Sequence, residues 1–214
     1  MDKMTLISLF QLGGWSMWPL LAMSIVTVAV TIERAIYFLM YDFKVTDIEE
    51  KVIEFLKNDD RDGAQAYLKT FKKKKLAAHI ILEGVTMAKL GEHRMEKAFE
   101  AETQKKVKDI EKGLNYLVEM GSIAPITGFL GTVSGMIGAF GAIAKATDVN
   151  AQLVAGGIFE ALITTAYGLI IAVVSITAYN VFTNIVERFI TNIERVGTDV
   201  VTTVLIQEHE KNNK

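Results

Sequence analysis

The sequence contains no cysteine, only two prolines and only three histidines among its 214 residues. The absence of cysteine excludes disulfides, thiol catalysis and cysteine-ligated metal sites. His79, His93 and His209 have no second ligand at helical spacing, so the sequence predicts no metal site. The phosphate-binding motif GxxxxGKS/T and the motifs GxGxxG and GxSxG are also missing, which leaves nucleotide hydrolysis and serine-hydrolase chemistry without support. We therefore expect neither an enzyme nor a bound cofactor.

Long uncharged runs dominate a chain in which 50% of the residues are hydrophobic. Residues 4–32, 120–144 and 161–186 carry no charged side chain. At 1.5 Å per helical residue, each run can cross a hydrocarbon core of roughly 30 Å. The scarcity of proline and the absence of strand-like alternation favour helices throughout. The sequence therefore predicts an all-α integral membrane protein with three transmembrane helices and long cytoplasmic helical extensions.

Basic residues lie mainly on one side of these spans. Lysines and arginines follow the first span, precede the second and follow the third, whereas the opposite side carries only Lys3 and Lys145. By the positive-inside rule, the N-terminus lies outside. The expected order is an N-terminal segment with the first transmembrane helix (1–41), a cytoplasmic helical domain (42–119), the second transmembrane helix (120–144), a short outer loop (145–150), the third transmembrane helix (151–186), and a cytoplasmic C-terminal helix and tail (187–214).

Aromatic residues flank the first apolar run. Trp15 and Trp18 lie near its start and three further aromatics follow its end, as in the two interfacial belts of a spanning helix. A cleaved signal peptide fits poorly, because the apolar stretch is too long and its N-terminus has one lysine offset by an aspartate. Gly13 and Gly14 predict a bend before the span, after a short interfacial helix.

Small residues follow one face of the second span and one face of the third. They recur at steps of three and four residues: Ala124, Gly128, Gly131, Gly135, Gly138 and Ala142, then Gly157, Ala161, Thr164, Gly168, Ala172 and Ser175. In lipid, small residues allow close helix contact, so we expect both faces to pack against protein. Taken alone, such stripes indicate packing more often than a pore.

Glu160 is a single carboxylate within an otherwise apolar run. An acid inside a membrane is costly and usually functional. However, residues 161–186 are uncharged and long enough to span alone, which would leave Glu160 at the head-group level. Both positions remain open at this point.

The sequence predicts that the polar region between the first two spans is helical. Amphipathic spacing predicts helices over 46–57, 64–71 and 76–90. From Glu92 the helical pattern continues into the second span with no breaker before Gly113 and Gly121, which predicts one long helix. The third span is expected to extend to about Gln207. The run Lys72 to Lys75 is interpreted as solvated surface lysines, because acids on either side leave no broad basic face for nucleic acid.

Two motifs resemble the paired signature of the ExbB/TolQ/MotA family of proton channels. They are APITGFLGTVSGMI at 124–137 and EALITTAYGL at 160–169. Glu33 and Arg34, which follow the first span and precede aromatic residues, are similar too, so these two residues and the tryptophans Trp15 and Trp18 are candidate membrane-interface anchors. Three spans with a large first loop favour the ExbB/TolQ branch over the four-span MotA branch.

The resemblance implies a homopentameric ring in the bacterial inner membrane, with the N-terminus and the short loop at 145–150 in the periplasm. The second and third spans would line a pore that holds the single-span helices of a dimeric ExbD/TolR-like partner. Ions driven by the proton motive force would pass between ring and partner, where an aspartate of the partner is the carrier. The resulting rotation would energise transport or envelope processes at the outer membrane. A TonB- or TolA-like protein and phospholipid are further expected partners, and nucleic acid is not.

The same resemblance assigns roles to individual residues. Thr132, Glu160 and Thr165 match the family's polar pore positions, and Thr164 joins this expected pore-lining set. Pro125 and Gly131 match the tight packing of the second span, and with them the expected packing set comprises Pro125, Gly128, Gly131, Gly135 and Gly168.

Two departures from the family pattern bear on the transported ion. The usual third-span proline is replaced by the run Ala172, Val173, Val174, and Thr127 adds a hydroxyl after Pro125. Additional oxygen ligands would also suit sodium, so we expect protons with sodium as the alternative. A rival function of another class is a non-conducting oligomeric membrane scaffold that recruits cytoplasmic partners.

Overall fold

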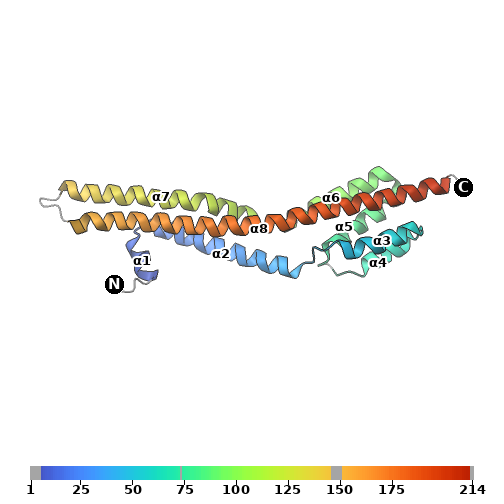
Figure 1. Cartoon of the computed structure of the whole chain (residues 1–214), viewed down its shortest axis with the longest axis horizontal. Helices are drawn as coiled ribbons and strands as arrows, with labels where there is room; N and C mark the ends of the chain where they lie inside the picture. Colours follow the sequence, from blue (N-terminus) through green and yellow to red (C-terminus); the bar gives the residue numbers. More distant parts are fainter. Residues whose placement is uncertain (1–5, 73, 146–150, 213–214) are drawn as a thin grey trace. The chain divides into compact units, whose positions relative to one another are not determined.

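The computed structural model describes residues 6–72, 74–145 and 151–212. They fold into helices joined by turns, with one isolated β-bridge between Asp42 and Lys75. In chain order the helices are α1 (Leu6–Leu12), α2 (Met17–Met40), α3 (Thr46–Lys57), α4 (Arg61–Lys69), α5 (Leu76–Thr86), the 3-10 helix η1 (Ala88–Leu90), α6 (Glu92–Glu111), α7 (Leu114–Lys145) and α8 (Ala151–Asn212) (Figure 1). The all-α prediction is thus confirmed for these residues. The predicted outer loop, apart from Lys145, lies outside them.

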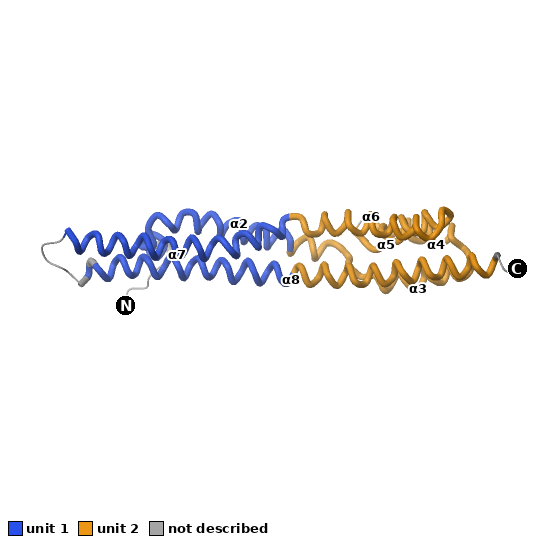
Figure 2. Tube along the Cα trace, turned by 90° about the horizontal axis from the view of Figure 1, so that it is seen from above, with its two compact units in different colours: residues 1–34, 113–181 blue, residues 35–112, 182–214 orange. Residues whose placement is uncertain are grey.

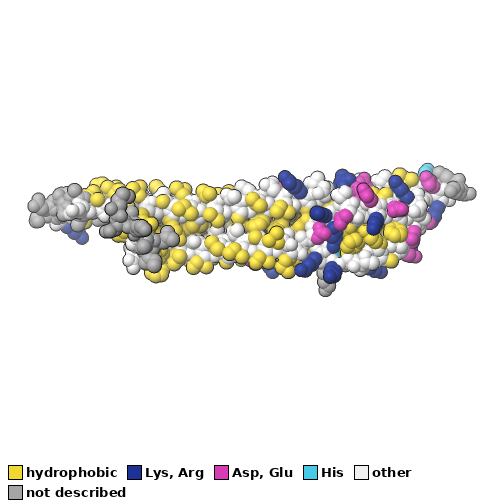
Figure 3. Space-filling view, turned by 60° about the horizontal axis from the view of Figure 1, so that its bottom comes forward, with side chains coloured by type: hydrophobic (Ala, Val, Ile, Leu, Met, Phe, Trp, Pro, Cys, Tyr) yellow, Lys and Arg dark blue, Asp and Glu magenta, His cyan; other side chains and the backbone are white. Residues whose placement is uncertain are grey.

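The helices form two compact units (Figure 2). Unit 1 comprises Met1–Arg34 and Gly113–Val181, and unit 2 comprises Ala35–Lys112 and Phe182–Lys214. Within the described ranges, three helices are long and apolar enough to cross a membrane, namely α2, α7 and α8. Hydrophobic side chains cover the face of unit 1 seen in Figure 3, whereas charged side chains gather over unit 2. The prediction of three transmembrane helices is confirmed.

A tight corner joins α1 to α2 in unit 1. The chain turns at Gly13 and Gly14, and Gly14 has a φ of 67°, a left-handed conformation that residues with a Cβ adopt at a cost. Pro19 lies in the first turn of α2, where its missing N–H breaks no helical bond. The predicted bend after a short helix is therefore confirmed.

Helices α7 and α8 approach closely along their small residues. A Cβ added to Gly128 would lie 2.7 Å from the carbonyl oxygen of Thr164, and one added to Gly168 would lie 3.2 Å from the Cα of Gly128. One added to Gly135 would lie 3.0 Å from the carbonyl oxygen of Gly157. Both stripes thus pack against protein within one chain as predicted, except at Gly138, where an added Cβ would meet nothing within 4 Å.

Unit 2 has its own apolar core. Helices α3, α4, α5 and α6 pack in sequence order against one another, and the C-terminal part of α8 adds a row of buried residues at helical spacing: Val186, Phe189, Ile193, Val196, Val200 and Val204. The extension of α8 to Asn212 confirms that the third span continues as a helix beyond its apolar run.

One predicted helix is interrupted. We expected a single helix from Glu92 into the second span, but α6 ends at Glu111 and α7 begins at Leu114. Gly113, between them, has a φ of 90°. A helix cannot continue through that backbone conformation, and glycine adopts it without a Cβ penalty. The prediction of one unbroken helix was therefore wrong at this point.

Candidate functional site

Two threonine hydroxyls face each other across the contact between α7 and α8. Thr132 on α7 and Thr165 on α8 share a hydrogen bond. The Thr132 hydroxyl also lies 3.0 Å from the carbonyl oxygen of Ala161 on α8, and the Thr165 hydroxyl lies 3.2 Å from that of Gly128 on α7. Each hydroxyl therefore reaches both the other hydroxyl and a backbone oxygen of the opposite helix.

This pair has fewer protons than hydrogen-bond positions. Each hydroxyl has one proton to donate. If both hydroxyls donate to the carbonyls, no proton remains between their oxygens, and if one donates to the other, one carbonyl loses its donor. The alternatives differ only in hydroxyl orientation and leave the net charge unchanged. The pair can therefore exchange hydrogen bonds with water or with a carboxylic acid without itself titrating.

Thr164 lies in a different environment from this pair. Its side chain is fully buried, and its hydroxyl donates to the carbonyl oxygen of Ala161 at 2.9 Å. A Cβ on Gly131 would lie 2.7 Å from the Cβ of Thr164. Within one chain, Thr164 thus fills the space that Gly131 leaves open, while Thr132 and Thr165 are half-buried. The role of Thr164 in lining a pore stays a prediction.

Glu160 lies on α8 five residues before Thr165, half-buried against the corner between α1 and α2. Its carboxyl carbon is 2.8 Å from the position that a Cβ on Gly14 would take. The structure therefore brings Glu160 to the corner. Its depth in a membrane stays open.

The expected packing residues of α7 lie where close helix contact requires them. Gly128, Gly131 and Gly135 are buried against α8. Pro125 lies inside α7 and is half-buried. A proline ring crowds the carbonyl four residues earlier, which here belongs to Gly121, a residue buried beside Ile176.

The candidate interface anchors differ in exposure. Trp15 and Trp18 are 55% and 66% exposed, as expected of residues in an interfacial belt. Arg34 is only 7% exposed and forms an ion pair with Glu33. Arg34 therefore packs inside the protein, and its predicted anchoring role stays untested.

Sequence reasoning missed three contacts of unit 1, of which two are hydrogen bonds. The indole N–H of Trp15 donates to the hydroxyl of Ser134 at 3.0 Å. Thr27 on α2 and Ser175 on α8 share a buried hydrogen bond of 3.0 Å. Gly14 contacts Glu160, as described above. The only available signal was helical spacing, which assigned Ser175 to a small-residue face but named no partner for it.

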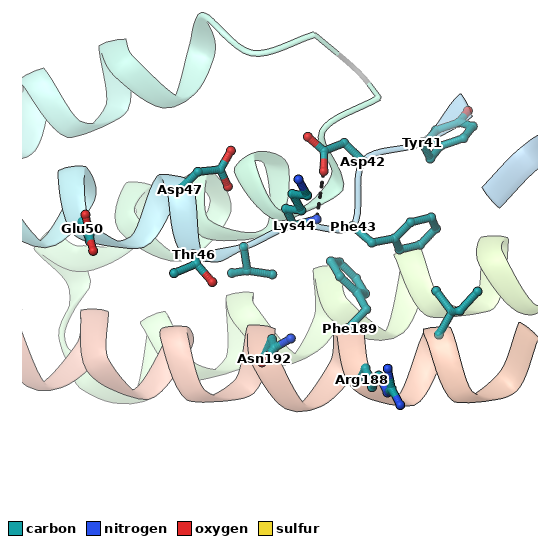
Figure 4. Close-up of a pocket in the computed structure, with 12 residues that line it drawn as sticks. Tyr41, Asp42, Phe43, Lys44, Thr46, Asp47, Glu50, Arg188, Phe189 and Asn192 are labelled. Carbon is teal, nitrogen blue, oxygen red and sulfur yellow. Dashed lines mark hydrogen bonds between the residues drawn. The ribbon is translucent and has the colours of Figure 1, made fainter. Parts of the chain in front are cut away.

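A pocket of about 760 Å³ lies within unit 2 (Figure 4). The rings of Phe43 and Phe189 meet edge to face at 5.5 Å, and charged residues including Lys44, Glu50 and Arg188 surround them. The pocket wall is a turn in which the backbone N–H of Lys44 donates to the Asp42 carboxylate at 2.9 Å. Because the pocket is lined by side chains of both charges, its lining does not favour one class of ligand.

Lys75 forms ion pairs with two aspartates that line this pocket, Asp42 and Asp47. Its ammonium lies 2.8 Å from Asp42 and 2.7 Å from Asp47, and the residue is 6% exposed. Burial would lower the pKa of Lys75, but the hydrogen bonds to both aspartates raise it above its usual 10.5. Burial would raise the pKa of Asp42, but bonds from Lys75 and the Lys44 N–H lower it below 3.8. Lys75 is therefore an exception to the predicted solvated lysine run.

Among the described residues, no cluster of three or more histidine, aspartate or glutamate side chains could hold a metal ion. The polar side chains of α7 and α8 at this contact are mainly neutral hydroxyls, with Glu160 five residues before Thr165. Such a site can form and break hydrogen bonds to water or to an acid in an apolar setting. It offers no nucleophile with an adjacent base.

Comparison with known proteins adds the family. The model of the MotA/TolQ/ExbB proton channel family matches residues 68–195, more than half of the chain, including both threonines and Glu160. The ExbB-like protein 3 of Synechocystis sp. is 29% identical over 82% of this chain and 84% of its own length.

Two further relatives match a shorter region. The biopolymer transport protein ExbB of Pseudomonas putida is 35% identical over 45% of this chain and 30% of its own length. The Tol-Pal system protein TolQ of Haemophilus influenzae is 40% identical over 36% of this chain and 33% of its own length. The matched region thus spans about a third of these two relatives. The chain has three helices long and apolar enough to cross a membrane, and the matched region contains both threonines. The chain is therefore a membrane protein that belongs to the MotA/TolQ/ExbB proton channel family.

Proposed function

We propose that this chain is the ring-forming subunit of an ion-channel motor that uses the proton motive force. The observation that carries the proposal is the hydroxyl pair of Thr132 and Thr165, half-buried at the α7–α8 contact within the region that matches a proton channel family. Its expected partner is a dimeric single-span protein of the ExbD/TolR type, bound in the centre of the ring. A TonB- or TolA-like protein would then carry the work to the outer membrane.

The proposed mechanism uses a carboxylic acid of the partner as the carrier. A charged carboxylate is costly in apolar surroundings, so proton uptake would allow it to enter and proton release would require it to leave. The hydroxyls of Thr132 and Thr165 would bond the acid or its waters during this step. The gradient supplies about 2.3 kcal/mol per charge per 100 mV, enough over several charges to move one helix past another.

The outer surface of α7 supports assembly with other chains. Bulky residues lie opposite its glycine face and are exposed within one chain: Ile126, Phe129, Val133, Ile137 and Phe140. In a membrane, such a face meets lipid, the partner helix or a neighbouring copy. We propose a homopentamer in the bacterial inner membrane, with the N-terminus in the periplasm and unit 2 in the cytoplasm. The number five rests on the resemblance.

The first test is the native mass of the complex extracted from membranes, with the chain expressed beside its genomic neighbours. A ring of several copies with a smaller single-span partner is the expected result. A ring without a partner would favour the non-conducting scaffold, and a monomer in mild detergent would contradict the ring.

The second test is ion flux through this complex in vesicles, with protons and sodium compared. We expect proton flux, and we expect Thr165→Val to reduce it about tenfold, because losing one hydrogen bond costs about 1 kcal/mol or more. Thr177→Val is the matched control, since Thr177 lies exposed on α8, twelve residues beyond Thr165. Full flux in Thr165→Val would remove this threonine from the pathway, and absence of wild-type flux would contradict the channel.

A further inference from the structure

Three consecutive residues of the α1–α2 corner contact the helices that carry the hydroxyl pair. Gly14 contacts the carboxyl group of Glu160 on α8, and Trp15 donates to Ser134 on α7. The Cβ of Ser16 lies 3.1 Å from the place that a Cβ on Gly131 would take. The corner is therefore seated on α7 and α8 at the level of the polar residues.

Gly14 meets two separate requirements in this arrangement. Its φ of 67° is a conformation that residues with a Cβ adopt at a cost. In addition, a Cβ at this position would overlap the Glu160 carboxyl group, with 2.8 Å to the carboxyl carbon and 3.5 Å to Cγ. Two other glycines, Gly91 and Gly113, meet only the first requirement. Gly91 also has a positive φ of 91°, but a Cβ there would have no neighbour within 4 Å.

The rest of the corner is fixed independently of Glu160. Ser16 and Met17 are each 2% exposed, and Met17 belongs to a small core with Leu20, Ala124 and Ile171. The Trp15 indole is tied to Ser134 by its hydrogen bond while its ring stays largely exposed. The corner thus has its own anchors and can serve as a fixed surface for the carboxyl group.

We propose that the α1–α2 corner is a positioning element for the ion pathway, in which Gly14 leaves the space that holds the Glu160 carboxyl group in one place. The inference rests on the proposed function, because it gives Glu160 a defined location beside the pathway. It assigns to the N-terminal corner, which lies outside the region matched by the family model, a role in the site built by α7 and α8. Gly14, Trp15 and Ser134 are positioning residues, since they act through Glu160.

The test measures the position of Glu160 without relying on flux. The full chain, in its native complex, is treated with a hydrophobic carbodiimide, and labelling of Glu160 is followed by mass spectrometry with Glu160→Gln as the blank. We expect Gly14→Ala to speed labelling about fivefold, the size of an ordinary coupling between contacting residues, because the carboxyl group must leave the corner. Gly91→Ala carries a comparable positive-φ cost without the contact and should label at the wild-type rate.

Ser134→Ala provides a second variant in case Gly14→Ala does not assemble. It adds no bulk and removes the acceptor for the Trp15 N–H, so it should loosen the corner and speed labelling about twofold. Wild-type labelling rates in both variants would overturn the positioning role.

Rescue by a shorter acid separates positioning from general damage. In a Glu160→Asp background the carboxyl group is withdrawn by one methylene, so Gly14→Ala should have little further effect on labelling or on flux. An equal effect of Gly14→Ala in both backgrounds would contradict the inference. If wild-type complexes label as expected but conduct no ions, the proposed function fails while the positioning role stands.

Discussion

The hydroxyls of Thr132 and Thr165 bond each other and cross the α7–α8 contact in opposite directions, each to a carbonyl oxygen of the other helix. Neither hydroxyl can be removed without changing the bonds available to the other. We therefore expect strong coupling between the two positions. In flux measurements, the double variant Thr132→Val with Thr165→Val should be no slower than either single variant. Effects that multiply would show instead that the two hydroxyls act separately.

Close packing of α7 on α8 predicts unequal effects of two glycine substitutions. Gly168→Ala would bring a Cβ to 3.2 Å from the Cα of Gly128, so the helices must separate. We expect a loss of about 1–3 kcal/mol in unfolding free energy, the usual cost of overpacking. Gly138→Ala is the matched control, because a Cβ there meets nothing within 4 Å. Unfolding in detergent by heat or denaturant measures both, and equal stabilities would refute the close contact.

The buried bond between Thr27 and Ser175 predicts a non-additive pair. Thr27→Val leaves the Ser175 hydroxyl buried without its partner, which costs about 1–3 kcal/mol. Ser175→Ala has the converse effect. Removing both partners should cost less than the sum of the single losses. The check is a double-mutant cycle on unfolding, with the exposed Thr177→Val as control. A purely additive cycle would mean that the two hydroxyls contribute independently.

Lys75, Asp42 and Asp47 predict a pH window for unit 2. The pKa of Asp42 is lowered, so its stabilising contribution is complete above its usual pKa of 3.8 and is lost as the pH falls through the lower folded value. The pKa of Lys75 is raised, so its contribution is complete below 10.5 and is lost as the pH rises through the higher folded value. The protection factors of the backbone amides of residues 41–47, which are hydrogen-exchange rates corrected for the intrinsic rate at each pH, should therefore be largest between these limits.

Lys75→Met isolates this contribution. The variant should lose about 1–3 kcal/mol of unfolding free energy at neutral pH, because it removes the charge-assisted bonds to two aspartates. Lys74→Met, at an exposed neighbouring position, should change little. An unchanged pH profile in Lys75→Met would mean that another group controls the acid limb.

The fold was predictable where it depends on apolar length and on local backbone requirements. Three uncharged runs predict three spans, and the pair Gly13 and Gly14 predicts the bend before α2. The break before α7 was not predicted because a helix can tolerate a single glycine. The sequence does not show that Gly113 has a positive φ, which is what ends the helix. Lys75 was assigned to the solvated run because no local pattern reveals its partners Asp42 and Asp47.

The site was predictable in part. Helical spacing brought the small residues of α7 and α8 to one face, and the two motifs pointed to Thr132, Glu160 and Thr165. The contact between Gly14 and Glu160 joins positions far apart in the chain, and helical periodicity carries no information about such pairs. The same holds for the bond from Trp15 to Ser134.

The proton arrangement of the Thr132 and Thr165 pair has an electrical consequence. Turning the two hydroxyls reverses a local dipole, although no heavy atom has to move and no charge is gained or lost. Side-chain rotations take roughly picoseconds to nanoseconds, whereas shifts of packed helices take roughly microseconds to milliseconds. The close, glycine-lined contact between α7 and α8 thus contains a hydroxyl pair whose dipole can reorient in response to a passing charge long before the helices move.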